Sequence, residues 1–386
     1  MSKTIIIIGA GLAGLSAALQ AAENGCNVKL VSSLPSERAQ SVMAEGGINA
    51  ALNTKDENDS PEEHFTDTIK AACGLADPNA VWGMTQAAPE LVHWLLKLGV
   101  KFNMSGYDDV DLRNFGGQKK KRTAFAQSDT GKQIMTAMID AVRRKEASGM
   151  VERFSHHSFL TLRLCGNICC GCVIRDEYSQ ETVELPGDAV IVATGGMHGL
   201  FGNTTGSLSN TGEVTAELFR LGVPLANGEM IQYHPTTVKC GGKRMLISEA
   251  ARGEGGRLFA MKDGKQWYFM EEKYPELGNL MPRDITAREI WKVSHESEVF
   301  LDMTEISEEI ISNKLSGLAD DCMTYLHKDI RKEPVSVLPG IHYFMGGILV
   351  DEQHRTPIQN LYAAGECCAQ YHGANRLGGN SLLGAL

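Results

Sequence analysis

The chain has 386 residues, more than one hydrophobic core usually supports, so two domains or one domain with a large insertion are expected. Its 37 Lys and Arg against 47 Asp and Glu give a net charge of −10, which argues against general polyanion binding, and no nucleic-acid partner is expected. No apolar run reaches the roughly 20 residues that cross a bilayer, so we expect no direct membrane insertion. The 41 glycines indicate tight turns or close backbone approaches to a ligand.

The N-terminus and the cysteines both indicate a reducing compartment. Lys3 precedes the apolar residues 5–8, but the stretch continues through three glycines without an obvious cleavage site, so a cytoplasmic start is expected. The ten cysteines are unevenly clustered, which is typical of reduced thiols. Cys169 and Cys170 are neighbours in a predicted strand and would point to opposite faces. We therefore expect buried strand thiols and no metal at Cys165, Cys169, Cys170 and Cys172.

The beginning of the chain has the pattern of a βαβ unit. Residues 4–8 are apolar and β-branched, which is typical of a parallel strand buried on both faces. A glycine-rich turn over 9–14 precedes the Ala- and Leu-rich residues 15–22, and Asn24-Gly25 can end that helix. Residues 28–31 predict the second strand. This order predicts a Rossmann-type opening.

Loops and helices follow this unit. Residues 39–52 predict a glycine-containing loop, and the polar, acidic residues 53–62 are expected to be exposed. Residues 89–99 predict a helix with Pro89 at its first position and a glycine at its end. Apolar residues repeat at helical spacing over 134–142 and predict another helix.

Strands are predicted in the middle of the chain. Residues 159–175, with a turn near Gly166-Asn167, and residues 182–185 predict antiparallel strands. Residues 188–196 predict a further buried strand that meets a glycine turn.

The character of the sequence changes at about Asn227. From there to Pro339 the βαβ alternation stops, which indicates an inserted second domain. Strand-turn patterning returns over 346–351 and 361–366, so the first domain is expected to resume there.

The glycine turn indicates dinucleotide binding. In a G-x-G-x-x-G turn the first glycine makes the turn, the second lets the backbone approach a pyrophosphate, and the third permits helix–strand packing. The usual acidic ribose ligand after the second strand is missing, because Ser32 and Ser33 stand there and only Glu37 is near; this disfavours a standard NAD site. Two later segments favour FAD over NAD, because they could bring backbone against an extended cofactor at several points: residues 193–196, and residues 361–366 followed by 373–383.

Together these motifs resemble the fumarate reductase and succinate dehydrogenase flavoprotein family, which also includes L-aspartate oxidase. The resemblance covers essentially the whole chain. Its markers are the turn over 9–14, Ser41-Val-Met-Ala-Glu-Gly-Gly47, Arg113-Asn-Phe-Gly-Gly117 with Arg122-Thr-Ala-Phe125 and Thr130-Gly131, Gln232-Tyr-His-Pro-Thr236, Ser248-Glu-Ala-Ala-Arg-Gly-Glu-Gly-Gly256, Pro282-Arg-Asp284, His342-Tyr343 and Ala374-Asn-Arg376.

The resemblance implies an α/β fold in which a Rossmann-like FAD-binding domain is interrupted by an α+β capping domain. The FAD-binding domain would then comprise residues 1–226 and 341–386, and the capping domain residues 227–340. The family continues past residues 380–383 into a helical domain that is absent here, so a C-terminally truncated member is expected.

The same resemblance implies how FAD is held. In the membrane-bound respiratory members a histidine in an R-S-H-[ST]-V pattern is linked to the flavin, whereas this chain reads Arg38-Ala-Gln-Ser-Val42 and has Gln40 at that position. We therefore expect noncovalent FAD, a lower flavin potential and a bias toward fumarate reduction. The expected FAD-binding residues are Gly9, Gly11, Ala13, Gly14, Ser32, Ser41, Gly46, Gly47, Ala193, Thr194, Gly195, Glu366, Asn380, Ser381 and Leu382.

Reduction of an activated double bond needs a hydride on one carbon, a proton on its neighbour, and cations that hold the carboxylates. The resemblance implies that the hydride comes from flavin N5 and the proton from Arg283, with Glu249 and Arg252 as a relay from solvent. A guanidinium is normally no acid near neutral pH, so this donor rests on the resemblance alone. The implied substrate-binding residues are His234, Ser248, His342, Arg376 and Phe115.

Simpler roles remain open for these side chains. Arg252 and Glu254 could form a surface ion pair, His234 could be a hydrogen-bonded loop histidine, and Arg283 could pair with Asp284. The remaining histidines, taken as structural or exposed, include His64, His93, His156, His157 and His198. Cys367 and Cys368 are expected to pack near the flavin.

The predicted function is FAD-dependent interconversion of fumarate and succinate, biased to fumarate reduction. One alternative is L-aspartate oxidase, which needs a carboxylate for the substrate ammonium where this chain has Phe115; another enoate reductase also remains open. A further alternative is a non-catalytic FAD-binding fragment that needs its missing C-terminal part. The expected partners are a dicarboxylate and an iron-sulfur or other electron-donor subunit, with a cytoplasmic location peripheral to the inner face of the membrane.

Overall fold

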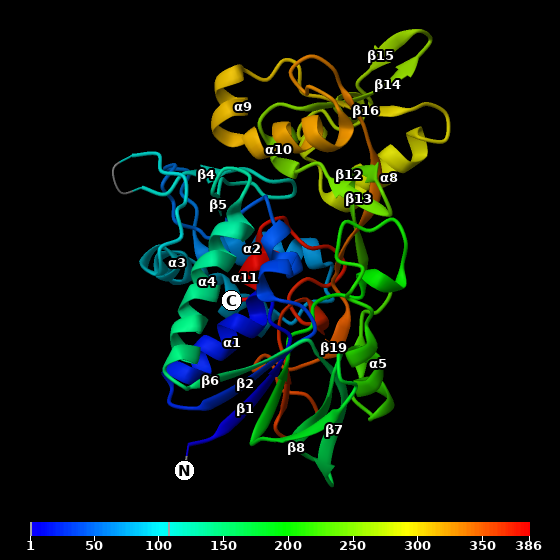
Figure 1. Ribbon diagram of the computed structural model, residues 1–386. Coiled ribbons are helices and arrows are strands. Elements are labelled where there is room, and N and C mark those ends of the chain that lie inside the picture. The colour runs from blue at the N-terminus through cyan, green and yellow to red at the C-terminus, as the bar shows by residue number, and fades with distance from the viewer. Residues whose placement is uncertain (1, 107–108) are drawn as a thin grey trace.

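The computed structural model describes residues 2–106 and 109–386. Its first layer is a five-stranded sheet in the order β20-β10-β1-β2-β6, and every neighbouring pair is parallel. The sheet lies in the lower half of the molecule in Figure 1. Its strands are β1 (Thr4–Ile8), β2 (Asn27–Ser32), β6 (Val151–Ser155), β10 (Ala189–Val192) and β20 (Leu361–Ala363). The predicted Rossmann-like α/β fold is confirmed, and residues 361–363 return to this sheet after a long excursion of the chain.

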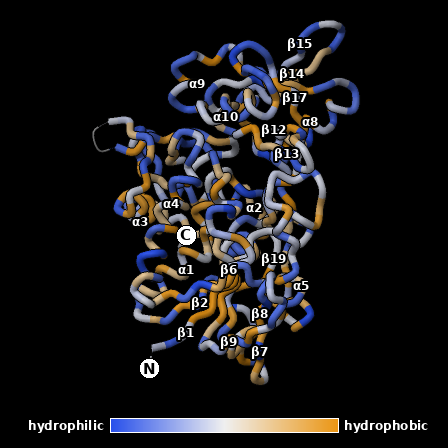
Figure 2. Tube along the Cα trace, viewed as in Figure 1, coloured by the Kyte–Doolittle hydropathy of each residue, from blue (hydrophilic) through white to orange (hydrophobic). Residues whose placement is uncertain are grey.

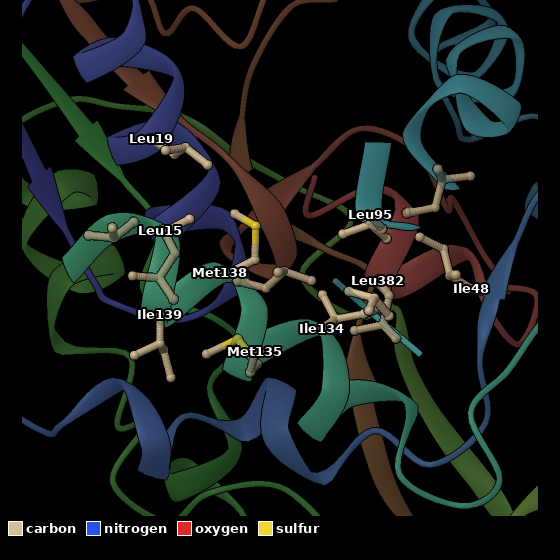
Figure 3. Close-up of a cluster of buried hydrophobic side chains, with 14 of the residues drawn as sticks. Leu15, Leu19, Ile48, Leu95, Ile134, Met135, Met138, Ile139 and Leu382 are labelled. Carbon is tan, nitrogen blue, oxygen red and sulfur yellow. The ribbon is translucent and has the colours of Figure 1, made fainter. Parts of the chain in front are cut away.

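Helices cover one face of the sheet. α1 (Leu12–Glu23) and α4 (Thr130–Ala147) pack on the face to which Ile7 points, and α11 (Asn380–Leu383) completes this core. Figure 3 shows the cluster, with Leu15 and Leu19 from α1 facing the apolar side chains of α4. The four isoleucines of β1 have the hydrophobic colour of Figure 2, as expected for a strand in a sheet covered on both faces, whereas apolar residues alternate with Asn27 and Lys29 in β2.

An antiparallel sheet covers the other face. β7 (His157–Cys165), β8 (Ile168–Asp176) and β9 (Thr182–Pro186) bury Leu162 and Ile174 against Ile6 and Ile8 of β1. The alternation of Ile6, Ile7 and Ile8 between the two faces follows from the two-residue period of a strand. α5 (Glu213–Arg220) packs beside β7, and the predicted hairpin with its turn at Gly166-Asn167 is confirmed.

The second part of the molecule forms the upper half of Figure 1. Two antiparallel sheets, β13-β12-β18 and β15-β14-β16-β17, share their own hydrophobic core with short helices. The strands are β12 (Ile231–Cys240), β13 (Lys243–Leu246), β14 (Arg257–Lys262), β15 (Lys265–Trp267), β16 (Val299–Asp302), β17 (Val335–Ser336) and β18 (Leu338–Phe344). The helices are α6 (Glu249–Gly253), α7 (Phe269–Lys273), α8 (Arg283–Val293), α9 (Glu308–Lys314) and α10 (Ser316–Asp321), followed by a π-helical turn over Cys322–Leu326. We refer to this part as the cap.

Short strands form two further small sheets outside the cap. β11 (Leu225–Ala226), β19 (Gly347–Leu349) and β21 (Cys368–Ala369) form one small sheet, and β3 (Ile48–Asn49), β5 (Thr123–Ala124) and β4 (Leu112–Arg113) form another. The predicted boundary between residues 340 and 341 falls within β18, so it crosses a continuous strand. The remaining single turns of 3-10 helix are Ser36–Arg38, Gln40–Met43, His198–Leu200, Gly278–Leu280 and Gly365–Cys367.

The helix predicted at Pro89 begins earlier than expected. α3 runs over Pro78–Leu98 and follows α2 (Pro61–Ala72), so Pro89 lies inside a helix rather than at its first position. The true start has stronger signals, because Asp77 accepts from the backbone of the first turn and Pro78 occupies the first position. Gly99, in the left-handed conformation, ends the helix as expected.

The segment expected to be exposed over 53–62 is partly buried. Asp59 is 8% exposed because it accepts two hydrogen bonds from Arg122, at 2.8 and 3.1 Å. Arg122 is fully buried and also contacts Asp67 at 3.0 Å. These ion pairs hold the acidic segment against the start of β5. The polarity of residues 53–62 indicates exposure and gives no sign of this distant partner.

The cysteine cluster is only partly buried. Cys169 and Cys172 are fully buried, but Cys165 is exposed and its sulfur lies 2.7 Å from that of Cys170. Cys165 pairs with Ile168, and Cys170 lies two residues beyond Ile168, so the two-residue period of a strand places Cys170 on the same side as Cys165. In the described part of the chain no group of three His, Cys, Asp or Glu side chains has the arrangement of a metal site. None of the helices described is long and apolar enough to cross a membrane.

Candidate active site

The turn between β1 and α1 has the close contacts of a dinucleotide cradle. A Cβ on Gly9 would lie 2.2 Å from the carbonyl oxygen of Ala193, and one on Gly14 would lie 1.9 Å from the carbonyl oxygen of Gly9. By contrast, a Cβ on Gly11 would make only ordinary contacts, at 3.8 Å, with Ala39 Cβ and Ser41 Oγ. The first and third glycines therefore permit packing, and the second leaves room for a phosphate at the start of α1.

A single large cavity extends from this turn to the cap. Its wall includes nearly all of the predicted FAD-binding residues: Gly9, Gly11, Ala13, Ser32, Ser41, Gly46, Gly47, Ala193, Thr194, Gly195, Glu366, Ser381 and Leu382. Gln40 also lines the cavity. Ser32 Oγ is buried without a partner in the described structure, as expected of a group that awaits a ligand. The glycine turn, the residues that line the cavity and the unpaired hydroxyl of Ser32 all fit a bound FAD.

Two predicted cofactor residues lie behind the wall. Gly14 permits the packing of α1 against the turn, as described above. The side chain of Asn380 is fully buried and bonds to Asn49, His64 and Thr68 at 2.7 to 3.0 Å. Burial lowers the pKa of His64 to about 3, so this histidine is neutral and structural, as expected.

Glu366 connects the cradle with the cap. Its Oε1 accepts from the backbone N–H of Phe344 at 2.9 Å and lies 3.1 Å from His198 Nε2. His198 is fully buried and also contacts Thr204 Oγ1 at 2.9 Å. The histidine therefore has a defined positioning role at the cavity wall, which no local signal in the sequence revealed.

Two cap strands bring the predicted substrate histidines together. His234 on β12 and His342 on β18 have ring centroids 5.1 Å apart, because the two strands pair antiparallel. Burial, reinforced by the charge of Arg283, lowers the pKa of both rings well below the usual value, so both are neutral near pH 7. Thr205 Oγ1 contacts His342 Nδ1 at 2.8 Å, and His234 Nε2 has no partner among the described residues.

Arg376 supplies the unpaired cation of the cavity. Its Nη1 donates to Ser381 Oγ at 2.9 Å, and its guanidinium carbon lies 4.3 Å from the centroid of Tyr343. Nε and Nη2 are buried and have no partner in the described structure. Burial and the charge of Arg283 lower its pKa to about 9. An uncompensated, desolvated guanidinium with two free N–H groups is suited to a carboxylate ligand.

A chain of charged side chains leaves the cavity through α6. Arg283 donates from Nε to Glu249 Oε2 at 2.8 Å, and Arg252 Nη2 lies 3.5 Å from Glu249 Oε1. Burial alone would raise the pKa of Glu249, but the guanidiniums of Arg283 and Arg252 outweigh it and hold this pKa below the usual value. Gly116 N–H also donates to Oε1 at 2.9 Å. Arg283 and Glu249 line the cavity, whereas Arg252 lies behind them.

These contacts decide between the roles left open by the sequence. Arg252 is buried and pairs with Glu249, so it does not form a surface ion pair; Glu254 contacts Lys314 instead, at 3.0 Å. Arg283 likewise pairs with Glu249 rather than with its neighbour Asp284.

Two amides in the site were missed by the sequence reasoning. Gln232 Oε1 accepts from Arg283 Nη1 at 3.1 Å, and its Nε2 donates to Asn375 Oδ1 at 2.9 Å. Asn375 in turn donates to Asp284 Oδ1 at 3.2 Å. The amide pair thus fixes the second edge of the Arg283 guanidinium. Gln232 begins the segment Gln232-Tyr-His-Pro-Thr236, but the sequence does not indicate that its amide contacts Arg283.

The remaining site residues close the cavity around these groups. Ser248 lines the cavity and begins α6, where its Oγ accepts from Ala250 N–H. Phe115 is 1% exposed and leaves no room for a Cβ on Gly46, since the ring would be 2.7 Å away. Glu45 also lines the cavity, and its Oε2 is shielded from solvent and has no partner in the described structure; desolvation together with Asp321 and Asp129 raises its pKa to about 8.

Comparison with known proteins agrees with this geometry. Residues 4–382 match the FAD binding domain family. The chain belongs to this family of FAD-dependent oxidoreductases. It is 44% identical over its whole length to the succinate dehydrogenase flavoprotein subunit of Bacillus subtilis, and 34% identical to the L-aspartate oxidase of Streptomyces coelicolor. In each case it spans 67% of the relative.

A solved structure supports the same assignment. E. coli quinol fumarate reductase superposes with a TM-score of 0.91 at 30% identity, over the whole of this chain and 68% of the other. The resemblance to fumarate reductase, succinate dehydrogenase and L-aspartate oxidase flavoproteins is therefore confirmed, and so is the fold class. The chain spans about two-thirds of the length of these relatives.

Proposed function

We propose that the chain interconverts fumarate and succinate with noncovalently bound FAD, with a bias toward fumarate reduction. One observation supports this most: the free N–H groups of Arg376 and the buried chain Arg283–Glu249–Arg252 adjoin the cavity that also contains the glycine cradle. An anion site and a proton path thus meet beside a cofactor site. Bound FAD supplies the hydride through its N5 position.

The substrate carboxylates are held by groups that lack protein partners. Arg376 offers Nε and Nη2 to one carboxylate, and its planar fork permits bidentate binding. His234 can donate from Nε2 in the tautomer that carries its proton there. Ser248 and His342 line the same cavity as further donors. Because both histidines are neutral, they orient the dicarboxylate without adding charge repulsion toward Arg376 and Arg283.

Arg283 delivers the proton to the alkene carbon next to the one that receives the hydride. Glu249 holds Nε and Gln232 holds Nη1, so the guanidinium is fixed by two different elements. Glu249 is ionised at rest, because its pKa is lowered; after the transfer it takes up a proton that arrives from solvent along Arg252 and passes it to the neutral Arg283. Arg252 extends the path to the backbone oxygen of Asn279, away from the cavity. Because a guanidinium is a weak acid, the transfer requires a strongly basic developing carbanion as the proton acceptor.

Gln40 supports noncovalent binding of FAD. The residue lines the cavity, but an amide forms no alkyl bond to the flavin. Acid precipitation of the FAD-loaded protein should therefore release all flavin into the supernatant. Flavin that stays with the pellet would contradict this proposal.

The decisive experiment is anaerobic reoxidation of the reduced, FAD-loaded protein. Fumarate should restore the visible flavin absorbance rapidly, Arg283→Lys should slow this step by at least a hundredfold, and Arg288→Lys on the exposed side of the same helix should not. L-Aspartate should fail to reduce the oxidised form, because Phe115 offers no carboxylate to an ammonium group. Retained FAD without turnover would instead support a non-catalytic fragment.

The resemblance also supports a place in a larger assembly. We propose that an iron-sulfur or other redox subunit donates electrons to this chain, and that the chain resides in the cytoplasm at the inner face of the membrane. The B. subtilis relative carries the word subunit in its name. Copurification of the natural complex tests this proposal.

A further inference from the structure

A second cavity lies between the two parts of the molecule, outside the site described above. Its volume is about 330 Å³. The loop before β4 and the loop after it contribute from the FAD-binding part, and the end of α6 and the end of α9 contribute from the cap. The charged residues in its wall are Lys55, Asp111, Arg113, Lys121, Glu254 and Lys314.

The cations of this cavity outnumber its carboxylates. Both carboxylates already have partners, since Lys55 contacts Asp111 at 2.5 Å and Lys314 contacts Glu254 at 3.0 Å. Lys121 contacts Glu57, which lies outside the wall, at 3.5 Å, so Arg113 is the wall cation whose guanidinium has no carboxylate in contact among the described residues. With Glu57 included, the groups around the cavity carry one excess positive charge that an anion would balance.

Arg113 is an unusual member of this wall because it is buried. It is 4% exposed, its guanidinium lies 3.6 Å from the centroid of Phe125, and its Nη2 donates to Gln127 O. Within the described residues its Nε and Nη1 have no partner. The carboxylates of Glu254, Asp111 and Glu45 only partly compensate for burial, which lowers the pKa of Arg113 to about 10. Two buried, unpaired donors of this kind are costly unless they bind something.

We propose that this cavity binds a small oxyanion, a phosphate or carboxylate group, held by Arg113 and Lys121 between the FAD-binding part and the cap. Arg113 provides the N–H pair that suits such a ligand, and Lys121 adds a flexible second cation. Lys314 of the cap lines the same wall, so a bound anion that also contacts Lys314 would hold the cap against the FAD-binding part. The site is independent of the proposed dicarboxylate reaction, since none of these residues lines the main cavity.

Calorimetric titration of the FAD-loaded protein with inorganic phosphate, and separately with acetate, tests the proposal. We expect saturable binding that Lys121→Gln and Arg113→Gln each weaken about tenfold or more, since each removes a charge-assisted contact. Lys119→Gln, an exposed lysine of the same loop outside the wall, should leave it unchanged. The tighter of the two probes identifies the anion class. Lys121 is half-exposed, so its substitution keeps the test valid even if Arg113→Gln does not fold.

Three results would overturn the proposal. They are the absence of saturable binding of either probe, equal weakening by Lys119→Gln, and loss of binding in Arg376→Gln, which would place the anion in the main cavity. A second readout reports on the cap: bound phosphate should slow amide hydrogen exchange at the end of α6 and in α9, and unchanged exchange there would contradict the bridging role.

Discussion

Glu45 should make this protein less stable as pH rises, whereas a carboxylate in an ion pair makes a protein less stable as pH falls. Its pKa rises from 4.5 to about 8 because it is buried and faces Asp321 and Asp129, with only Arg113 acting in the other direction among its charged neighbours. The folded state thus binds its proton more tightly than the unfolded chain does. Stability is therefore lost as pH rises from about 4.5 to about 8.

The magnitude follows from the size of the shift. At roughly 1.4 kcal/mol for each pKa unit, ionised Glu45 costs the folded state on the order of 4 kcal/mol at pH 8 and above. Glu45→Gln removes the ionisation and keeps the size of the side chain. The melting temperature of the variant relative to wild type should therefore rise by about 5 °C or more between pH 5 and pH 9.

Thermal unfolding of the FAD-loaded proteins across this pH range checks the prediction. Glu23→Gln, at the exposed end of α1, is the matched control and should show no pH-dependent difference. If the difference between Glu45→Gln and wild type were the same at pH 5 and pH 9, the carboxyl would not be held neutral by its surroundings, and the reasoning would be refuted.

Three further substitutions test other parts of the structure. Arg122→Met should destabilise the protein by about 3 to 5 kcal/mol in denaturant unfolding, because it leaves two buried carboxylates, one of them Asp59, without a cation; unchanged stability would contradict this. Gly11→Val should abolish FAD retention on a desalting column while circular dichroism stays native, since the new side chain projects into the cradle. Gln232→Leu should slow fumarate-dependent reoxidation in a single turnover about tenfold, because Arg283 loses one of its two holding contacts; an unchanged rate would remove the amide from the mechanism.

The local parts of the fold could be predicted from the sequence. The strand over 4–8, the glycine turn and the following helix each have a short-range pattern, and the spacing of Gly9, Gly11 and Gly14 also specifies which of them must face a ligand. The start of α3 was misplaced because Pro78 and Pro89 both have the sequence appearance of a first helical position, and only the capping contact of Asp77 distinguishes them.

The missed parts depend on contacts between distant segments. Gln232 meets Arg283 only because β12 lies beside the start of α8. Glu45 acquires its raised pKa from desolvation, reinforced by Asp321 and Asp129, which lie far along the chain and in different parts of the molecule. No pattern within a few residues of either side chain carries this information.

The position of β18 links the cofactor cradle to the proposed dicarboxylate pocket. β18 pairs with β12 and so fixes His342 against His234. At its end, the N–H of Phe344 donates to Glu366, which follows the sheet strand β20 and lines the cradle. A shift of the strand by one residue would turn His342 to the opposite face and break the bond to Glu366. One strand therefore sets the distance between the residues proposed to bind the substrate and those that line the FAD cradle, and variants of Glu366 should disturb both sites together.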